Sequence, residues 1–420
     1  MMSIKKIISH GFSYIFISSV LNKIINFLCN SIIVHLLSKA DYGTYVYAYN
    51  IVGFALLMAG LGIPSGLLQI LSEEFKNKDK VKFLYQSGSS IAGIFNILLC
   101  GALIGTSWCI PLKIEEARRY LFLLSLIPFF DTCLSLQLIY LRSALRSKQY
   151  AIANNINTIL LAIFTVIGAY WGQVDGIIYG KYLSYIISVI LFICIFKIPS
   201  FFGKVNIKKG LNKDLLKLSI ISMANNGLSE LLYLLDVFIM GITIVNQEII
   251  ASYKVATYIP SALSFIPLTV ITYIYPYFAQ HRGDCVWLKK NYPKILLSMG
   301  GLNLVVILPL FILAPNVIRI FYGANYQDAI PIFRILLINF FVSGTFRILS
   351  GNLLVTQRQL KFNFYVALFS SVVNTVGNFI LIPKWGSMGA VFTTVFVVII
   401  TSILSTYKLC KVIYGEHLAC

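Results

Sequence analysis

The sequence predicts an all-α polytopic membrane protein of about twelve transmembrane helices in two six-helix lobes. Of the 420 residues, 58% are hydrophobic and only 12% are charged, and the mean hydropathy is +0.83. A hydrocarbon core about 30 Å thick needs about 20 apolar residues per helix, and such stretches recur along the whole chain. Each stretch must be helical because lipid offers no partner to backbone polar groups. A soluble multi-domain enzyme is therefore excluded.

The apolar stretches give the helices in order. With a window of about 19 residues, the spans are expected at 12–37, 43–70, 83–109, 119–141, 151–171, 176–197, 218–241, 251–279, 295–314, 329–352, 363–383 and 389–408. Lys5 and Lys6 precede the first span as in a signal peptide. That span is too long for a signal peptide and no small-residue cleavage site follows, so we expect it to be retained.

The charge distribution predicts the topology. The formal net charge is +19, and most basic residues lie in the hydrophilic breaks between apolar stretches. Even-numbered breaks and both termini hold roughly four times as many basic residues as odd-numbered breaks, which places both termini in the cytoplasm. This topology explains the positive charge without a nucleic-acid partner. The eight cysteines form no Cys-x-x-Cys motif and no histidine lies at ligand spacing, so neither disulfides nor a metal site is expected.

Similarities between the two halves indicate a duplication. A polar stretch at 197–217 lies at the midpoint and divides lobes at 1–208 and 209–420. Residues of the same type recur at offsets of 210, 214 and 212 positions, and the pairs are Gln149 and Gln359, Trp171 and Trp385, and Ala117 and Ala329. Six helices per copy preserve orientation in the membrane, so we expect parallel repeats about an axis along the membrane normal.

Two predicted helices carry polar stripes. Asn22, Asn26 and Asn30 recur every four positions on the first helix, beside Lys23. On the seventh helix the polar positions are Ser222, Asn226, Ser229, Tyr233 and Asp236. Such spacing places the side chains along one side of a helix. They either line a cleft or form hydrogen bonds between helices.

Eight ionisable residues fall inside the predicted spans. They are Lys23, Asp131, Lys181, Glu230, Asp236, Lys254, Arg334 and Arg347. A charge at mid-bilayer costs about 2.5 to 3.5 kcal/mol on lenient scales, so this number indicates function. Those near a membrane surface, where the side chain can snorkel, are Lys181, Lys254, Arg334 and Arg347. Those nearer mid-membrane, which either line a polar cavity or form an internal ion pair, are Lys23, Asp131 and Glu230.

The remaining motifs indicate neither a cofactor-binding site nor a catalytic site. Gly60, Gly62 and Gly66 lie inside an apolar helix and indicate close helix packing rather than a dinucleotide fingerprint. The four histidines have no carboxylate at catalytic spacing, and no nucleophile constellation is present. A transporter is therefore expected rather than an enzyme.

Three segments carry a resemblance to a known family. They are Leu36-Leu37-Ser38-Lys39-Ala40-Asp41-Tyr42-Gly43-Thr44-Tyr45 with Gly60-Leu61-Gly62-Ile63; Asp236 and Gly241 with Ala251-Ser252-Tyr253-Lys254-Val255-Ala256; and Pro315 through Phe321-Tyr322-Gly323-Ala324-Asn325-Tyr326 with Ala329 and Pro331. On these segments the chain resembles the multidrug/oligosaccharidyl-lipid/polysaccharide exporter superfamily, in its O-antigen flippase (Wzx) or polysaccharide biosynthesis branch. It departs from many relatives at Gln69, where a basic residue is expected.

The resemblance implies a function. It implies a flippase that moves undecaprenyl-pyrophosphate-linked O-antigen repeat units for lipopolysaccharide across the bacterial inner membrane, by rocking of two lobes around a central cavity. The candidate substrate-binding residues are Lys23, Asn26, Asn30, Lys181, Lys254, Arg334 and Arg347. The candidate ion-coupling residues, with H+ or Na+ as the coupling ion and no other cofactor, are Asp236, Glu230 and Asp131. Alternatively Asp236 forms an ion pair with Lys254. Membrane lipids, a polysaccharide polymerase and a chain-length regulator are the implied partners.

Three other functions remain open. A drug antiporter of the same superfamily should have a more apolar and acidic cavity. A membrane polysaccharide polymerase or ligase usually needs a large periplasmic loop, whereas the longest outer break here is about 14 residues by our window assignment. A lipid II flippase resembles this fold but usually has two further helices.

Overall fold

The computed structural model describes residues 13–74, 77–199, 213–244 and 246–415, and all regular structure within these ranges is helical. The chain divides into two compact units, Met1–Gly241 and Ile242–Cys420. Each unit is described by itself. The predicted lobe boundary at 208/209 lies outside the described residues.

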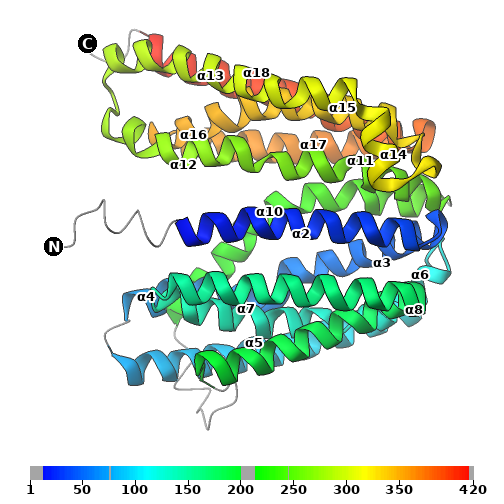
Figure 1. Ribbon diagram of the computed structural model, residues 1–420. Coiled ribbons are helices and arrows are strands. Elements are labelled where there is room, and N and C mark those ends of the chain that lie inside the picture. Colours follow the sequence, from blue (N-terminus) through cyan, green and yellow to red (C-terminus); the bar gives the residue numbers. More distant parts are fainter. Residues whose placement is uncertain (1–12, 75–76, 200–212, 245, 416–420) are drawn as a thin grey trace. The chain divides into compact units, whose positions relative to one another are not determined.

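Within its described residues, unit 1 contains nine helical elements, which Figure 1 shows from blue to green. They are α2 (Ser13–Leu36), α3 (Lys39–Met58), the 3-10 segment η2 (Ala59–Gly62), α4 (Ile63–Glu73), α5 (Lys78–Cys109), α6 (Glu116–Leu124), α7 (Ile127–Ser143), α8 (Ser147–Phe196) and α10 (Lys213–Thr243, in this unit up to Gly241). α2 packs along α8, where the Ser18 hydroxyl donates to Asn155 Oδ1 at 2.6 Å. α7 also packs against α8.

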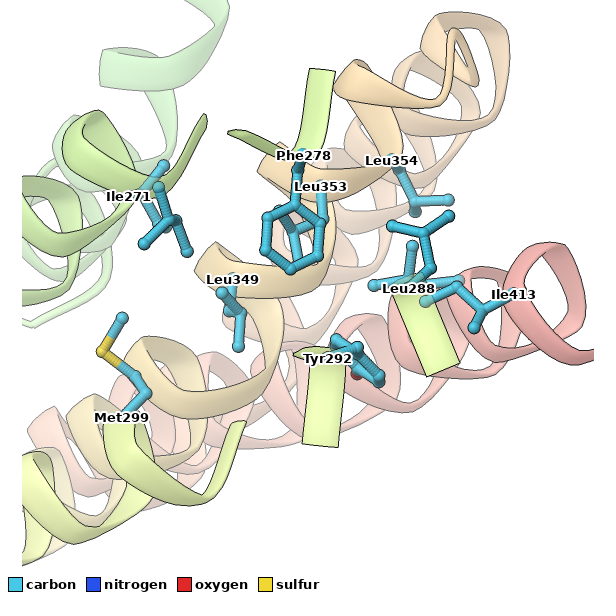
Figure 2. Packing of buried hydrophobic residues seen from close by; sticks show 11 residues of the cluster. Ile271, Phe278, Leu288, Tyr292, Met299, Leu349, Leu353, Leu354 and Ile413 are labelled. Atoms are coloured by element: carbon cyan, nitrogen blue, oxygen red, sulfur yellow. The ribbon is translucent and has the colours of Figure 1, made fainter. Parts of the chain in front are cut away.

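Unit 2 contains the remaining elements. They are α11 (Gln247–Leu263), α12 (Phe265–Gln280), α13 (Cys285–Ile312), α14 (Ala314–Tyr322), η3 (Ala324–Tyr326), α15 (Ala329–Val342), the π-helical η4 (Ser343–Arg347), α16 (Ile348–Thr356), α17 (Leu360–Trp385) and α18 (Ser387–Tyr414). One buried apolar cluster joins α12, α13, α16 and α18. Figure 2 shows Phe278, Leu288, Tyr292 and Leu353 meeting within it.

The number of spans agrees with the prediction. Within the described ranges, ten helices are long and apolar enough to cross a membrane. One of them, α8, has 50 residues, about 75 Å of helix at 1.5 Å per residue. It reverses at Gly172 and Gln173, where φ and ψ are not helical, and therefore supplies two spans. If α10, a helix of 31 residues, is also counted as a span, the total reaches twelve. The protein is thus a multi-pass, all-helical membrane protein.

The two units repeat the same unusual backbone. Gln173 in unit 1 has φ 49° and ψ −130°, and Gly386 in unit 2 has φ 60° and ψ −137°. Leu145 (φ 56°) and Arg358 (φ 58°) form a second such pair. Both pairs are separated by 213 positions, within the 210 to 214 expected from the sequence. Equal backbone conformation at equal spacing is what a duplication predicts.

The hairpin of α8 depends on small residues at its crossing. A Cβ added to Gly176 would collide with the backbone carbonyl of Gly168, and one added to Gly180 would collide with that of Phe164. The two halves of α8 therefore approach to backbone contact, as small residues allow between membrane helices. In unit 2, Gly389 meets the carbonyl of Leu381 in the corresponding way.

This geometry predicts the effect of a single methyl group. Gly176→Ala should lower the stability of the protein by about 1 to 3 kcal/mol, because the helices must separate to admit the methyl. The midpoint of thermal unfolding in detergent measures the change. Gly172→Ala is the matched control, since nothing lies within 4 Å of its added Cβ and its φ is negative. Equal midpoints for both variants would contradict the packing described here.

Candidate functional site

The second predicted helix is broken. The sequence predicted one helix over 43–70, but Gly60, Leu61 and Gly62 take left-handed φ values of 58°, 53° and 68° between α3 and α4. The two glycines adopt such values at little cost, and Pro64 starts α4 where a missing N–H costs nothing. The interpretation of these glycines as packing residues was therefore incomplete.

The break is held by a side chain of a neighbouring helix. The Gly60 N–H donates to Asn96 Oδ1 on α5 at 2.7 Å, and Asn96 is 1% exposed. The N–H of Ile63 donates to the Gly60 carbonyl. An unpaired peptide group in the hydrocarbon region costs several kcal/mol, so these bonds are what make a break tolerable at this depth.

α10 packs against the broken helix along its length. A Cβ added to Gly62 would collide with the Ser219 carbonyl, and one added to Gly53 would lie 2.8 Å from Leu234 Cδ2. Later positions of α10 thus meet earlier positions of the broken helix, so the two run antiparallel. The packing role expected for Gly62 is found here, against the N-terminal part of α10.

A pocket of about 240 Å³ opens at the break. It is lined by Leu56, Leu57, Ala59, Gly62, Pro64, Ser65, Asp131, Thr132, Ser135, Met223, Gly227 and Glu230. Two carboxylates thus reach it from different helices, Asp131 from α7 and Glu230 from α10. None of the described lining residues is basic. The pocket has the polarity of a cation or proton site rather than of an anion site.

Asp131 also belongs to a cluster of charged and aromatic side chains. The Asp131 carboxylate lies near Lys181 on α8 and near Tyr185, but it forms no direct ion pair with Lys181. The Lys181 Nζ lies 3.8 Å from the ring centre of Tyr49 and 5.6 Å from that of Tyr45. Cations are attracted to aromatic faces at such distances. The Lys181 ammonium group therefore lies near one carboxylate, that of Asp131, and two aromatic rings, those of Tyr45 and Tyr49.

This arrangement has a chemical consequence. Two charges withdrawn from water are costly unless each compensates the other, and removing one leaves the other uncompensated. Protonation of Asp131, or binding of a cation to it, would leave Lys181 supported only by Tyr45 and Tyr49. The cluster can therefore exist in two charge states. Among the described residues no group of three or more His, Cys, Asp or Glu could hold a metal ion.

The remaining predicted residues of unit 1 lie elsewhere. Lys23 and Asn26 are exposed on α2, and Asn30 Oδ1 accepts a hydrogen bond from the Tyr42 hydroxyl at 3.0 Å. Asn30 thus acts as a link between α2 and α3, the alternative left open by the sequence. Asp236 is 6% exposed on α10. The side chains of Asn226, Ser229 and Tyr233 lie outside the described residues.

Three predicted residues lie in unit 2. Arg334 on α15 donates from Nε to the Phe311 carbonyl at 3.2 Å, and its guanidinium lies 5.4 Å from the Phe311 ring centre. Arg334 therefore fastens α15 to α13. Lys254 is half-buried on α11, and Arg347 is half-buried in the π-helical segment η4.

Sequence reasoning missed the aromatic part of the cluster. Tyr45 and Tyr49 lie four positions apart on α3 and stack with ring centres 5.9 Å apart. That spacing puts both rings on one side of a helix and was a usable signal. Of the predicted residues, Asp131, Glu230 and Lys181 are brought together by the structure. The signal for the broken helix was Gly60-Leu61-Gly62 followed by Pro64.

Known proteins resemble this chain in sequence and in fold. The Escherichia coli K12 lipopolysaccharide biosynthesis protein WzxC is 26% identical over 201 residues, which are 47% of this chain and 39% of that protein. The chain thus spans about two fifths of the length of this relative.

Two solved structures share the fold. An inward-facing multidrug resistance MATE family transporter of the MOP superfamily gives a TM-score of 0.72 at 16% identity, covering 94% of this chain and 96% of its own. The inward closed lipid II flippase MurJ gives 0.71 at 16% identity, covering 93% and 86%. These likenesses confirm the exporter-superfamily fold.

The family itself follows from the sequence profile of the polysaccharide biosynthesis proteins, which matches residues 32–331. This range includes the broken helix, the acidic pocket and the Asp131 cluster. On that match the chain belongs to the polysaccharide biosynthesis protein family.

Proposed function

We propose that the protein is a flippase for lipid-linked oligosaccharides. Its cargo is an O-antigen or related repeat unit on undecaprenyl pyrophosphate, moved from the cytoplasmic to the periplasmic leaflet of a bacterial inner membrane by alternating access. The observation that carries this proposal is the family match over residues 32–331, on a fold shared with a lipid II flippase. The topology from basic residues, with both termini cytoplasmic, belongs to the proposal.

The acidic pocket supports a coupling role for unit 1. Asp131 and Glu230 line one pocket whose described lining holds no basic residue, and Lys181 lies near Asp131 outside that lining. In our proposal H+ or Na+ binds at Asp131 and releases Lys181, which changes the packing of α7 against α8. The sequence predicted that Lys181 binds pyrophosphate. In our proposal Lys181 takes part in ion coupling instead, because it lies beside Asp131, Tyr45 and Tyr49. Asp236 remains a further candidate.

A pyrophosphate cargo is negatively charged and requires basic groups outside the acidic pocket. The proposed pyrophosphate and sugar residues are Lys23, Asn26, Asn30, Lys254, Arg334 and Arg347. An inside-negative potential favours outward passage by about 2.3 kcal/mol per uncompensated negative charge per 100 mV, so too many fixed bases would trap the cargo. A small positive excess is therefore expected. A polysaccharide polymerase and a chain-length regulator are the proposed protein partners.

A drug antiporter is the second candidate function. The observation in its favour is the acidic lining of the pocket, because Asp131 and Glu230 would suit a cationic drug. A volume of about 240 Å³ argues against it, since drug-sized ligands occupy pockets of about 300 to 1,000 Å³.

The two functions predict different phenotypes. Deleting the gene should make lipid-linked repeat units accumulate on the cytoplasmic leaflet and remove surface polysaccharide, with restoration by the wild-type gene. Extracted lipid-linked sugars and surface polysaccharide are the quantities to measure. Unchanged polysaccharide together with increased sensitivity to cationic drugs would favour the antiporter and contradict the flippase.

The Asp131 and Lys181 pair makes a second prediction. Asp131→Asn and Lys181→Gln should each reduce surface polysaccharide, and the double variant should lose less than the product of the two losses. Interacting residues couple by about 0.5 to 3 kcal/mol, which corresponds to a recovery of roughly two- to a hundredfold. Polysaccharide is scored at matched protein levels.

Asp175→Asn is the matched control, because it also removes one carboxylate from unit 1 but not one that lines the pocket. Asp175 on α8 forms an ion pair with Arg119 outside the pocket. Asp175→Asn should leave polysaccharide near the wild-type level, because exposed ion pairs contribute about 0 to 1 kcal/mol. Full activity of Asp131→Asn, or strictly multiplicative losses in the double variant, would remove the pair from the coupling site.

A further inference from the structure

A second pocket lies in unit 2, outside the site described above. Its volume is about 510 Å³. Three segments surround it: the turn between α12 and α13, the turn between α16 and α17, and the last turns of α18. The lining residues that matter here are Arg282, Gly283, Gln357, Gln359, Lys408 and Lys411.

The pocket is basic. Arg282, Lys408 and Lys411 line it, and none of its described lining residues is acidic. The ion pairs Lys80–Glu74 and Arg119–Asp175 do not involve these three side chains. Asp284, next to Gly283 in the sequence, uses its Oδ1 to accept the Trp287 N–H at 2.9 Å. Among the residues that the structure describes, no carboxylate therefore cancels the positive charge of the pocket.

Helix ends adjust this charge without reversing it. α12, α16 and α18 end beside the pocket, and each C-terminus contributes a partial negative charge of roughly half a unit. α13 and α17 begin there, and each N-terminus contributes a partial positive charge of similar size. With three basic side chains, the described residues give the pocket a net positive charge of about two to three.

A hydrogen-bonded frame fixes the walls. Gln357 is 7% exposed and its Oε1 accepts the Gly283 N–H at 3.4 Å. Its Nε2 donates to the Phe278 carbonyl at 3.4 Å and to Thr356 Oγ1 at 3.1 Å. One buried side chain thus joins the turn after α12 to the turn after α16. Nothing lies within 4 Å of a Cβ added to Gly283, so the space beside this turn is open.

Basic residues at cytoplasmic helix ends follow from topology alone. Arg282 and Lys411 are exposed, as are Lys290 and Lys294 on α13 of the same unit. The difference is that Arg282, Lys408 and Lys411 come from two separate segments to line one cavity. The concave arrangement on a fixed frame is the feature that topology does not explain.

We propose that this basic pocket binds a phosphate-bearing ligand. A phosphate monoester carries about −1.5 to −2 charges at neutral pH and a phosphodiester headgroup such as that of phosphatidylglycerol carries about −1, so the positive pocket attracts both. Arg282 can bind two phosphate oxygens with its planar guanidinium, and the lysines add point charges. The volume exceeds that of phosphate alone and admits an attached glycerol or sugar. The source is either an anionic lipid headgroup or a soluble phosphate ester.

The test uses the purified full-length protein in phosphatidylcholine nanodiscs at constant ionic strength. One arm titrates glycerol 1-phosphate and follows binding by calorimetry. The other adds phosphatidylglycerol to the bilayer and counts retained lipid by native mass spectrometry. The pocket variant is Arg282→Gln with Lys411→Gln. Lys290→Gln with Lys294→Gln removes the same charge from exposed positions of the same unit and is the matched control.

The pocket variant should weaken glycerol 1-phosphate binding, or reduce retained phosphatidylglycerol, at least tenfold, whereas the control should stay within twofold of wild type. Binding of glycerol 1-phosphate would identify a soluble ester, and retention of phosphatidylglycerol alone would identify a lipid. Equal losses in both variants would show a diffuse surface potential and overturn the proposal. So would the absence of binding by the wild-type protein in both arms.

Discussion

The hydrogen bond from the Gly60 N–H to Asn96 Oδ1 is the interaction on which the candidate site depends. Lipid cannot satisfy a peptide group, so a transmembrane helix can break only where the protein supplies a partner. Here Asn96 supplies it from α5. The break ends α3 at Met58 and starts α4 at Ile63, and the pocket opens between them. A continuous helix would fill this space with its own side chains.

The break also determines which charges meet. α10 packs on the broken helix and brings Glu230 to the pocket that Asp131 enters from α7. Behind Asp131, Lys181 rests on the rings of Tyr45 and Tyr49. A half-buried carboxylate and lysine near each other stabilise little in themselves, because desolvation offsets most of the attraction. Such a cluster can hold two charge states, and our coupling proposal rests on this property.

The sequence was most informative where one physical effect dominates. Hydropathy predicted the spans, including the reversal of α8 near Gly172, because lipid selects apolar helices regardless of tertiary detail. The duplication appeared as repeated residue types and is found again as equal backbone angles at Gln173 and Gly386. The contacts of Asp131 with Lys181 and of Arg334 with Phe311 were not predictable. They depend on how each helix is rotated about its axis, which a uniformly apolar helix does not encode.

Gradient-driven transport in proteoliposomes tests the coupling claim most directly. The reconstituted protein should move a fluorescent undecaprenyl-pyrophosphate-linked sugar across the bilayer faster when a proton or sodium gradient is imposed, and the acceleration should disappear in Asp131→Asn. A transport rate independent of both gradients, or a gradient dependence that persists in Asp131→Asn, would contradict the account.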